Sequence, residues 1–227
     1  MVEIRNGDRE NARAWFYYSD LDRADASAAL NEEKIEYYGL DESIKCFCDQ
    51  IAHEECGDSL PLAILGFSQG AVFAHILTRL ATNSTANGCD CITSQSEATS
   101  NMLRQLSRIQ CAIMCSGFEA MHFEMHSGQD DGDGKDADFL NTHISSLFTT
   151  TTCTNNRGGH QDQFIITNFP SLHVFGEKDT SVPPMMSDKL SHQFEERNIH
   201  VHGKGHIIPQ DVESCSQIIS FLDTFLP

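Results

Sequence analysis

A serine at position 68 stands between two glycines in the segment GFSQG, residues 66–70. This segment fits the G-x-S-x-G pattern, in which small flanking residues allow a strained turn between a strand and a helix to expose the serine hydroxyl. The pattern is short and recurs by chance, so its surroundings must separate a nucleophile from an ordinary hydroxyl in a bend. Residues 60–65 form a short apolar run, and residues 71–80 are apolar nearly all round. A buried strand followed by a buried helix is the context that a nucleophilic Ser68 requires.

An activated serine needs a base and a group that orients the base. Asp179 follows the apolar run at residues 171–175, and His206 follows the run at residues 199–202. In a doubly wound sheet, loops at the carboxyl ends of the strands hold the active crevice. The chain order Ser68, Asp179, His206 is the order found in hydrolases with this serine turn.

Other residues compete for two of these roles. Glu177 and Asp162 are the alternatives to Asp179, which the turn residues after it favour. The chain has 11 histidines, so a histidine after a strand is by itself weak evidence. The glycine-bounded loop and the apolar, proline-ended segment after it distinguish His206, whereas we interpret His160, His200 and His202 as surface or core residues.

These residue types predict acyl transfer. Ser68 Oγ would attack an acyl carbonyl, His206 would accept its proton and return it to the leaving alcohol, and Asp179 would fix the imidazole tautomer. The backbone N–H of Gln69 would donate one hydrogen bond to the oxyanion. We expect no metal and no cofactor, because neither the cysteine pairs nor the acidic stretch at residues 129–140 has the spacing of a metal site.

Alternation of apolar runs with helical patterns predicts an α/β fold with a mostly parallel sheet. Helical spacing is present at residues 40–51, 185–196 and 212–226. The length of 227 residues favours one domain over residues 1–227. Polar segments at about residues 81–101 and 127–163 are interpreted as flexible insertions.

The composition restricts partners and compartment. A net charge of −18 disfavours binding to nucleic acid or to anionic membrane surfaces. No apolar run approaches the ~20 residues of a membrane span, and the polar start lacks the pattern of an export signal. We therefore expect a cytoplasmic protein, or one found also in the nucleus, whose nine cysteines are reduced.

Six segments together resemble the FSH serine hydrolase family, of the ovarian cancer-associated serine hydrolase type. They are RAWF at residues 13–16, GLDESI at 39–44, LGFSQGA at 65–71, CSGF at 115–118, SLHVFGEKDTSVP at 171–183 and GKGHIIP at 203–209. The resemblance covers most of residues 12–80 and 108–226. It implies an α/β-hydrolase fold, a carboxylesterase acting on esters with fairly long acyl chains, and a triad of Ser68, Asp179 and His206.

One departure from the family pattern is predicted to have consequences. The family begins with a strand, a helix and a second strand before an aromatic segment, which here is residues 15–18, whereas this chain begins almost at that segment. We expect the missing strand to leave residues 62–65 with an open edge and to remove a second oxyanion donor. One alternative is therefore a catalytically impaired hydrolase acting as an interaction protein, with self-association through the open sheet edge. A second alternative, independent of the missing strand, is an acyl-thioesterase using the same triad.

Overall fold

The computed structural model describes residues 2–3, 13–18, 35–53, 60–86, 97–120, 123–125 and 165–226. The chain divides into two compact units. The prediction of a single domain over residues 1–227 therefore stays a prediction. The predicted insertion at residues 127–163, with the acidic stretch at 129–140, lies outside the described residues.

Unit 1 comprises Met1–Glu54, Asp90–Met102 and Met121–Thr150. Its predicted amphipathic helix is confirmed as α1 (Leu40–His53), which buries Leu40, Ser43, Ile44 and Cys48. The Phe16 and Tyr37 rings are both buried, with centroids 5.0 Å apart, so the aromatic segment contributes to packing. The strands of this unit are β1 (Val2–Glu3) paired with β2 (Arg13–Ala14), and a second sheet of β3 (Tyr17–Tyr18), β4 (Ile35–Tyr38) and β7 (Phe123–Met125).

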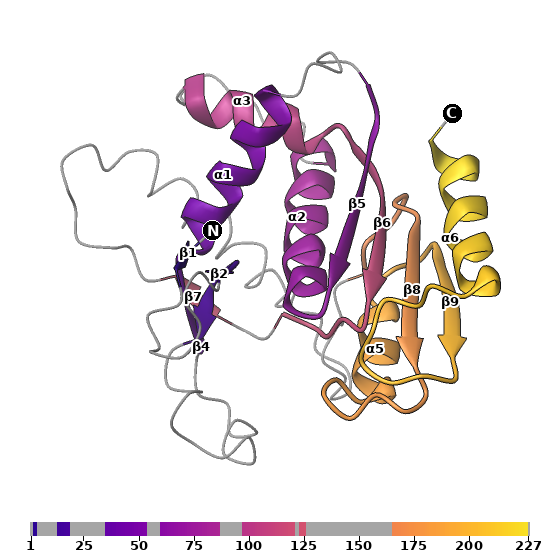
Figure 1. Cartoon of the computed structure of the whole chain (residues 1–227). Helices are drawn as coiled ribbons and strands as arrows, with labels where there is room; N and C mark the ends of the chain where they lie inside the picture. The colour runs from indigo at the N-terminus through magenta and orange to yellow at the C-terminus, as the bar shows by residue number, and fades with distance from the viewer. Residues whose placement is uncertain are drawn as a thin grey trace, which may run out of the picture. The chain divides into compact units, whose positions relative to one another are not determined.

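Unit 2 comprises Glu55–Cys89, Leu103–Ala120 and Thr151–Pro227, and it contains a four-stranded parallel sheet (Figure 1). The strands lie in the order β5, β6, β8, β9, and every neighbouring pair is parallel. This arrangement confirms the predicted α/β class. Among the described residues, β5 is an end strand of the sheet. The strand bounds are Leu62–Phe67 for β5, Ile109–Cys115 for β6, Ser171–Gly176 for β8 and Arg197–His202 for β9.

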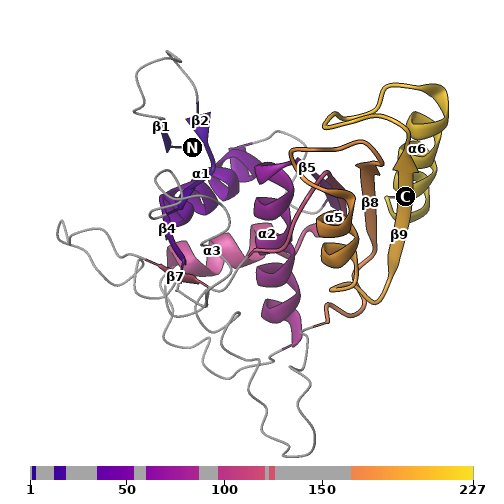
Figure 2. The same cartoon turned by 90° about the horizontal axis from the view of Figure 1, so that it is seen from below.

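Helices cover both faces of this sheet (Figure 2). On one face, α6 (Val212–Phe225) packs its Phe221 against a buried cluster of Cys111, Ile113, Cys115, Leu172 and Val174. The other face is covered by α2 (Gln69–Ala86) and α5 (Pro184–Ser191). Residues 71–81 of α2 are all buried, as the apolar sequence after Ser68 predicts. The sheet is thereby fixed between two helical layers, and its carboxyl edge carries the loops.

Some boundaries differ from the prediction. Helix α5 ends at Ser191 rather than near residue 196, because Phe194 is buried and forms an isolated parallel bridge with Ile166. The predicted insertion at residues 81–101 holds the end of α2 and the start of α3 (Glu97–Leu106), while residues 87–96 lie outside the described part. Among the described residues, no helix is both long and apolar enough to cross a membrane.

Candidate active site

The sequence-predicted site residues lie in loops at one edge of the unit 2 sheet. Ser68 follows β5 directly, Asp179 lies three residues after β8, and His206 lies four residues after β9. Because all four strands are parallel, their carboxyl ends meet at the same edge (Figure 1). The sheet thus directs three loops, distant in sequence, toward one region.

Ser68 occupies a strained turn. Its φ angle is 54°, in the left-handed region that non-glycine residues rarely adopt. Its N–H donates to the Cys115 carbonyl at 2.9 Å, and its carbonyl accepts from Ala71 N–H at 2.9 Å, the first turn of α2. A Cβ atom at Gly66 would lie 2.2 Å from the Gly70 carbonyl oxygen, so the close approach requires glycine at position 66. Both the strain and the small flanking residues are those of a strand-to-helix nucleophile turn.

Gln69 is the first residue of α2. The helix dipole places partial positive charge at the first turn of a helix, which favours a developing negative charge nearby. The predicted role of the Gln69 N–H as an oxyanion donor is compatible with this position.

Asp179 and His206 form a direct pair. The His206 Nδ1 atom lies 2.8 Å from the Asp179 Oδ2 atom, and the Asp179 side chain is fully buried while that of His206 is 24% exposed. The other oxygen, Oδ1, accepts hydrogen bonds from the backbone N–H groups of Ser181 at 3.0 Å and Val182 at 2.9 Å. These two donors fix the carboxylate, which in turn orients the imidazole.

The hydrogen bonds keep Asp179 ionised. Burial acts to raise the pKa of this carboxyl, but the hydrogen bonds from the Val182 N–H and the His206 ring, with the nearby Ser116 hydroxyl, outweigh it, and the pKa of Asp179 is lowered. An ionised carboxylate only accepts hydrogen bonds, so His206 Nδ1 carries the proton. The Nε2 atom of a neutral His206 is then a proton acceptor, which is the state a general base requires.

His206 also lies against the serine turn. Its ring centroid is 4.7 Å from that of Phe67, the residue that precedes Ser68. In the described part of the chain, no hydrogen bond joins the Ser68 hydroxyl to His206. Catalytic hydrogen bonds are often long or poorly aligned in free enzymes. The structure therefore pairs Asp179 with His206, and Ser68 directly follows Phe67, whose ring contacts the His206 ring.

The alternative residues lie elsewhere or outside the described chain. Glu177 is exposed, and its backbone N–H donates to the His202 carbonyl. His200 bonds to the Ser214 hydroxyl at 2.8 Å, and His202 is buried. Asp162 and His160 lie outside the described residues. Among the described candidates, the carboxylate in contact with His206 is that of Asp179.

Sequence reasoning did not find Ser116. This residue follows β6 directly, is fully buried and has a φ angle of 46°. Its N–H donates to the Val174 carbonyl at 2.8 Å; its buried hydroxyl has no hydrogen-bond partner among the described residues, and its proximity contributes to the lowered pKa of Asp179. The available signal was its position directly after an apolar strand, which puts it at the same edge as Ser68 and Asp179.

The absence of a metal and of a cofactor stays a prediction. Among the residues that the structure describes, no group of three or more histidine, cysteine or acidic side chains is placed to hold a metal ion.

The chain is similar to known serine hydrolases. A family model described as serine hydrolase (FSH1) matches residues 2–218. The curated protein "Esterase OVCA2" of Homo sapiens is 38% identical over 58 residues, which cover 26% of this chain and 26% of that protein. The Xenopus tropicalis protein of the same name is 40% identical over 57 residues, 25% of each chain.

Comparisons with solved structures cover more of the chain, at lower sequence identity. Zea mays acyl-protein thioesterase 2 has a TM-score of 0.49 at 16% identity, with 94% of this chain and 73% of that chain covered. Esterase PE8 has a TM-score of 0.45 at 18% identity, with 93% and 70% covered. The family match extends over nearly the whole chain and over every residue of the proposed site. The chain therefore belongs to the FSH1 serine hydrolase family.

Proposed function

We propose that this chain is a serine hydrolase that cleaves carboxylic esters through Ser68, His206 and Asp179. The observation that carries the proposal is the buried Asp179 carboxylate paired with His206 at 2.8 Å, with the imidazole against the residue that precedes a strained serine. Family membership supports a hydrolase. The roles of the three residues rest on geometry and chemistry.

The first half of the reaction forms an acyl-enzyme. As the Ser68 Oγ atom bonds to the acyl carbon, His206 Nε2 takes the hydroxyl proton and the carbonyl electron pair moves to oxygen. The Gln69 N–H donates to this oxyanion. The tetrahedral intermediate collapses, the bond to the leaving oxygen breaks, and the imidazolium returns its proton to the departing alcohol.

The second half uses water. His206 takes a proton from water as its oxygen bonds to the acyl carbon, and the collapse of this intermediate breaks the bond to Ser68 Oγ. The imidazolium returns the proton to Ser68, and a carboxylic acid is released. Throughout, Asp179 remains ionised and stabilises the imidazolium, because the hydrogen bonds from the Val182 N–H and the His206 ring lower the pKa of Asp179 against the effect of burial.

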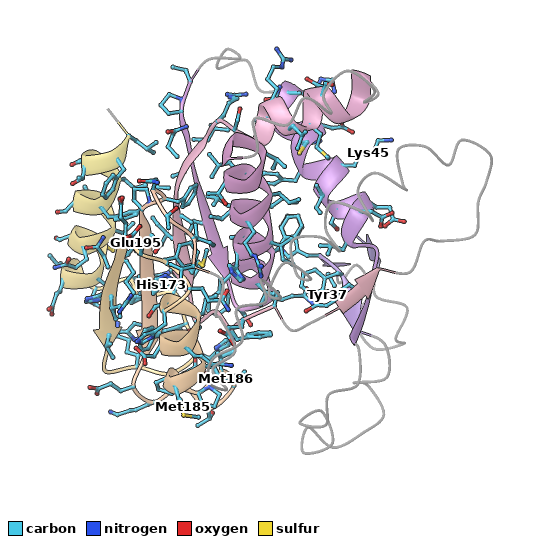
Figure 3. The ribbon with its side chains drawn as sticks, turned by 180° about the vertical axis from the view of Figure 1, so that it is seen from behind. Tyr37, Lys45, His173, Met185, Met186 and Glu195 are labelled. Carbon is cyan, nitrogen blue, oxygen red and sulfur yellow. The ribbon has the colours of Figure 1, made fainter. Side chains whose placement is uncertain are left out.

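An apolar acyl group is the substrate feature that the surroundings favour. Exposed apolar side chains follow both Asp179 and His206 in the chain. Met185 and Met186 project from the start of α5, after the Asp179 loop (Figure 3), and Ile207 and Ile208 directly follow His206. Exposed apolar side chains beside a polar catalytic pair are typical of a binding site for an apolar group. We therefore expect longer acyl chains to be preferred over acetyl.

Hydrolysis of p-nitrophenyl esters tests the function. The full chain is expected to hydrolyse them, with kcat/KM rising from the acetate to the octanoate, whereas Ser68→Ala is expected to be inactive. Ser107→Ala is the matched control. The exposed Ser107 hydroxyl donates to the Arg104 carbonyl, and Ser107 lies just before β6, at the amino end of the strands rather than at the carboxyl end that carries Ser68. Equal activity of the chain and its Ser68→Ala variant would overturn the proposal.

A second function has one specific observation in its favour. Among the described residues β5 ends the sheet, and Leu65 on it is 49% exposed. An end strand can pair with a strand of another chain, so self-association through β5 is the alternative function. A folded but inactive protein that elutes as a dimer, and as a monomer when Leu65→Lys is introduced, would favour this alternative.

A further inference from the structure

The segment between β9 and α6 carries His206 and is held at both of its ends. We call residues 203–210 the histidine loop. Its first three residues are Gly203, Lys204 and Gly205, and a Cβ atom at Gly203 would meet no heavy atom within 4 Å. Glycines on both sides of a residue give the backbone additional freedom. Because this freedom would let the loop move, contacts that hold Lys204 restrict the positions open to His206, two residues later.

One attachment joins the histidine loop to the segment that carries Asp179. The Lys178 N–H donates to the Lys204 carbonyl at 3.1 Å, and the Glu177 N–H donates to the His202 carbonyl at 2.9 Å. A Cβ atom at Gly176 would lie 2.2 Å from the Lys204 carbonyl oxygen. The backbone at Lys204 thus lies directly against the end of β8.

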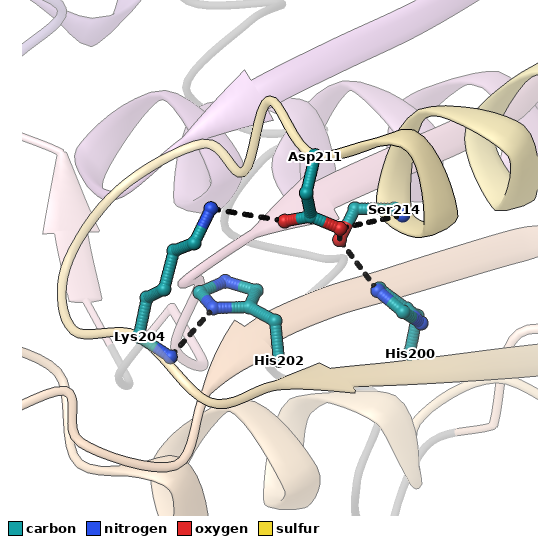
Figure 4. A network of polar contacts seen from close by, with 5 residues as sticks. All are labelled: His200, His202, Lys204, Asp211 and Ser214. Atoms are coloured by element: carbon teal, nitrogen blue, oxygen red, sulfur yellow. Dashed lines mark hydrogen bonds and ion pairs between the residues drawn. The ribbon is translucent and has the colours of Figure 1, made fainter.

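The Lys204 N–H also donates to His202 Nδ1 at 3.3 Å (Figure 4), and a further attachment is made by the Lys204 side chain. Its Nζ atom lies 3.0 Å from Asp211 Oδ2, at the far end of the loop (Figure 4). Asp211 is the N-cap of α6, and its Oδ1 accepts from the Ser214 N–H at 3.0 Å and from the Ser214 hydroxyl at 2.9 Å. The Ser214 N–H, the Lys204 ammonium and the Ser214 hydroxyl lower the pKa of Asp211, so it is ionised at neutral pH.

A third contact connects this cap to the sheet. The single proton of the Ser214 hydroxyl is donated to Asp211, so the hydroxyl accepts its other hydrogen bond from His200 Nε2 at 2.8 Å. His200 is a residue of β9. The ion pair therefore closes the loop onto a helix start that is itself bonded to the strand before the loop (Figure 4).

We propose that Lys204 is a positioning residue for His206, acting through its ion pair with Asp211. The inference rests on the proposed function, because it assigns His206 a position that matters for reaction. The two side chains are 47% and 40% exposed, and an isolated pair of this kind contributes little to global stability. The expected consequence of breaking it is a displaced imidazole in a protein that remains folded.

Four single variants and one double variant test the proposal. Lys204→Met removes the charge, Lys204→Arg retains it, and Asp211→Asn retains an N-cap acceptor while removing the partner charge. Lys189→Met is the matched control, because Lys189 lies on α5, outside the histidine loop, and forms an ion pair with Glu119. The readouts are the rate of labelling by a fluorophosphonate probe, hydrogen exchange of a peptide covering residues 203–210, and the melting temperature.

If the ion pair positions His206, the variants should give a specific pattern of labelling rates. Lys204→Met and Asp211→Asn are each expected to label about fivefold more slowly than wild type, with unchanged melting temperatures and faster exchange in the loop. The double variant that combines Lys204→Met with Asp211→Asn should be no slower than either single variant, and Lys204→Arg and Lys189→Met should label at the wild-type rate. Raising salt to about 1 M should slow wild type toward Lys204→Met, because charges on exposed groups are then screened.

The outcomes separate this proposal from the proposed function. Wild-type labelling with an equal rate and equal loop exchange in Lys204→Met would overturn the positioning role and leave the esterase proposal intact. Absence of labelling at Ser68 in wild type would overturn the esterase proposal. In that case, equal loop exchange in wild type and Lys204→Met would overturn the loop attachment as well, and faster exchange in Lys204→Met would support the attachment without a catalytic role.

Discussion

His206 Nδ1 and Asp179 Oδ2 lie 2.8 Å apart although the two residues are 27 positions apart in the chain. The carboxylate is fully buried and accepts two backbone hydrogen bonds on its other oxygen, while the imidazole is partly exposed. A fixed, ionised carboxylate bonded to Nδ1 leaves Nε2 of the neutral imidazole as the proton acceptor in the proposed reaction. This arrangement, a buried carboxylate paired with a partly exposed imidazole, is the basis for the proposed hydrolytic role.

Replacing Asp179 with Asn is expected to lower kcat by about 10³- to 10⁴-fold. The Asn carbonyl would keep the two hydrogen bonds from Ser181 and Val182, so its amide NH₂ would face His206. The Nδ1 atom would then have to accept, the proton would move to Nε2, and the imidazole could no longer act as a base. Steady-state kinetics with a p-nitrophenyl ester measure the effect.

Asp188→Asn is the matched control for this substitution. Asp188 is exposed on α5 and lies 3.9 Å from its neighbour His192 rather than near His206. It should leave kcat within about twofold of wild type, since surface substitutions away from special features have small effects. An Asp179→Asn variant as active as Asp188→Asn would remove Asp179 from the mechanism.

Gly66→Ala is expected to damage the serine turn. The new Cβ atom would lie 2.2 Å from the Gly70 carbonyl oxygen and 2.6 Å from the Ala71 Cα atom, both in the backbone. Backbone must shift to relieve such contacts, so we expect a loss of about 1–3 kcal/mol in the free energy of unfolding, together with reduced activity. Urea unfolding and ester hydrolysis measure the two effects.

Gly203→Ala provides the comparison for stability, because its Cβ atom would meet nothing within 4 Å. Its free energy of unfolding should stay within about 0.5 kcal/mol of wild type. If the two alanine variants are equally stable, the close approach at Gly66 is not a constraint on the turn.

His173 makes stability depend on pH. Burial, with the charges of Arg197 and His192, lowers the pKa of His173 to about 3, whereas an unfolded histidine has a pKa of about 6.5. A lowered pKa in the folded state means that the stabilisation is full above about pH 6.5 and is lost as the pH falls toward about 3. At about pH 4.5 the loss is expected to be about 3 kcal/mol, from about 1.4 kcal/mol per pH unit.

The variant His173→Gln isolates this contribution. The Ser171 hydroxyl donates to the Glu196 carbonyl, so it accepts from His173 Nε2, and the Gln amide can replace that donor. Urea unfolding at about pH 7 and about pH 4.5 should show a smaller pH dependence for the variant than for wild type. Equal pH dependence of the two proteins would mean that His173 is not the neutral buried group responsible.

The sequence pattern was most informative where it was local. Apolar runs and glycine spacing predicted β5, the Ser68 turn and α2. Chain order and turn residues favoured Asp179 over Glu177, and the carboxylate in contact with His206 is indeed that of Asp179. The assignment of catalytic roles stays a prediction.

Contacts between separate segments could not be predicted in this way. The contribution of Ser116 to the pKa of Asp179 depends on β6 lying next to β8. The sequence of a single strand does not determine which strands lie beside it. The Lys204–Asp211 ion pair depends on how the histidine loop returns to α6. Helix α5 also ended early because burial of Phe194 competes with helical periodicity.

The most direct measurement is fluorophosphonate labelling of the full chain, with the modified residue located by mass spectrometry. Because the serine turn, the buried Asp179–His206 pair and the start of α2 meet at one sheet edge, we predict a single adduct on Ser68 that is absent in Ser68→Ala. It should also form much more slowly in Asp179→Asn. No adduct on a folded, monodisperse chain, or an adduct that persists in Ser68→Ala, would contradict the account.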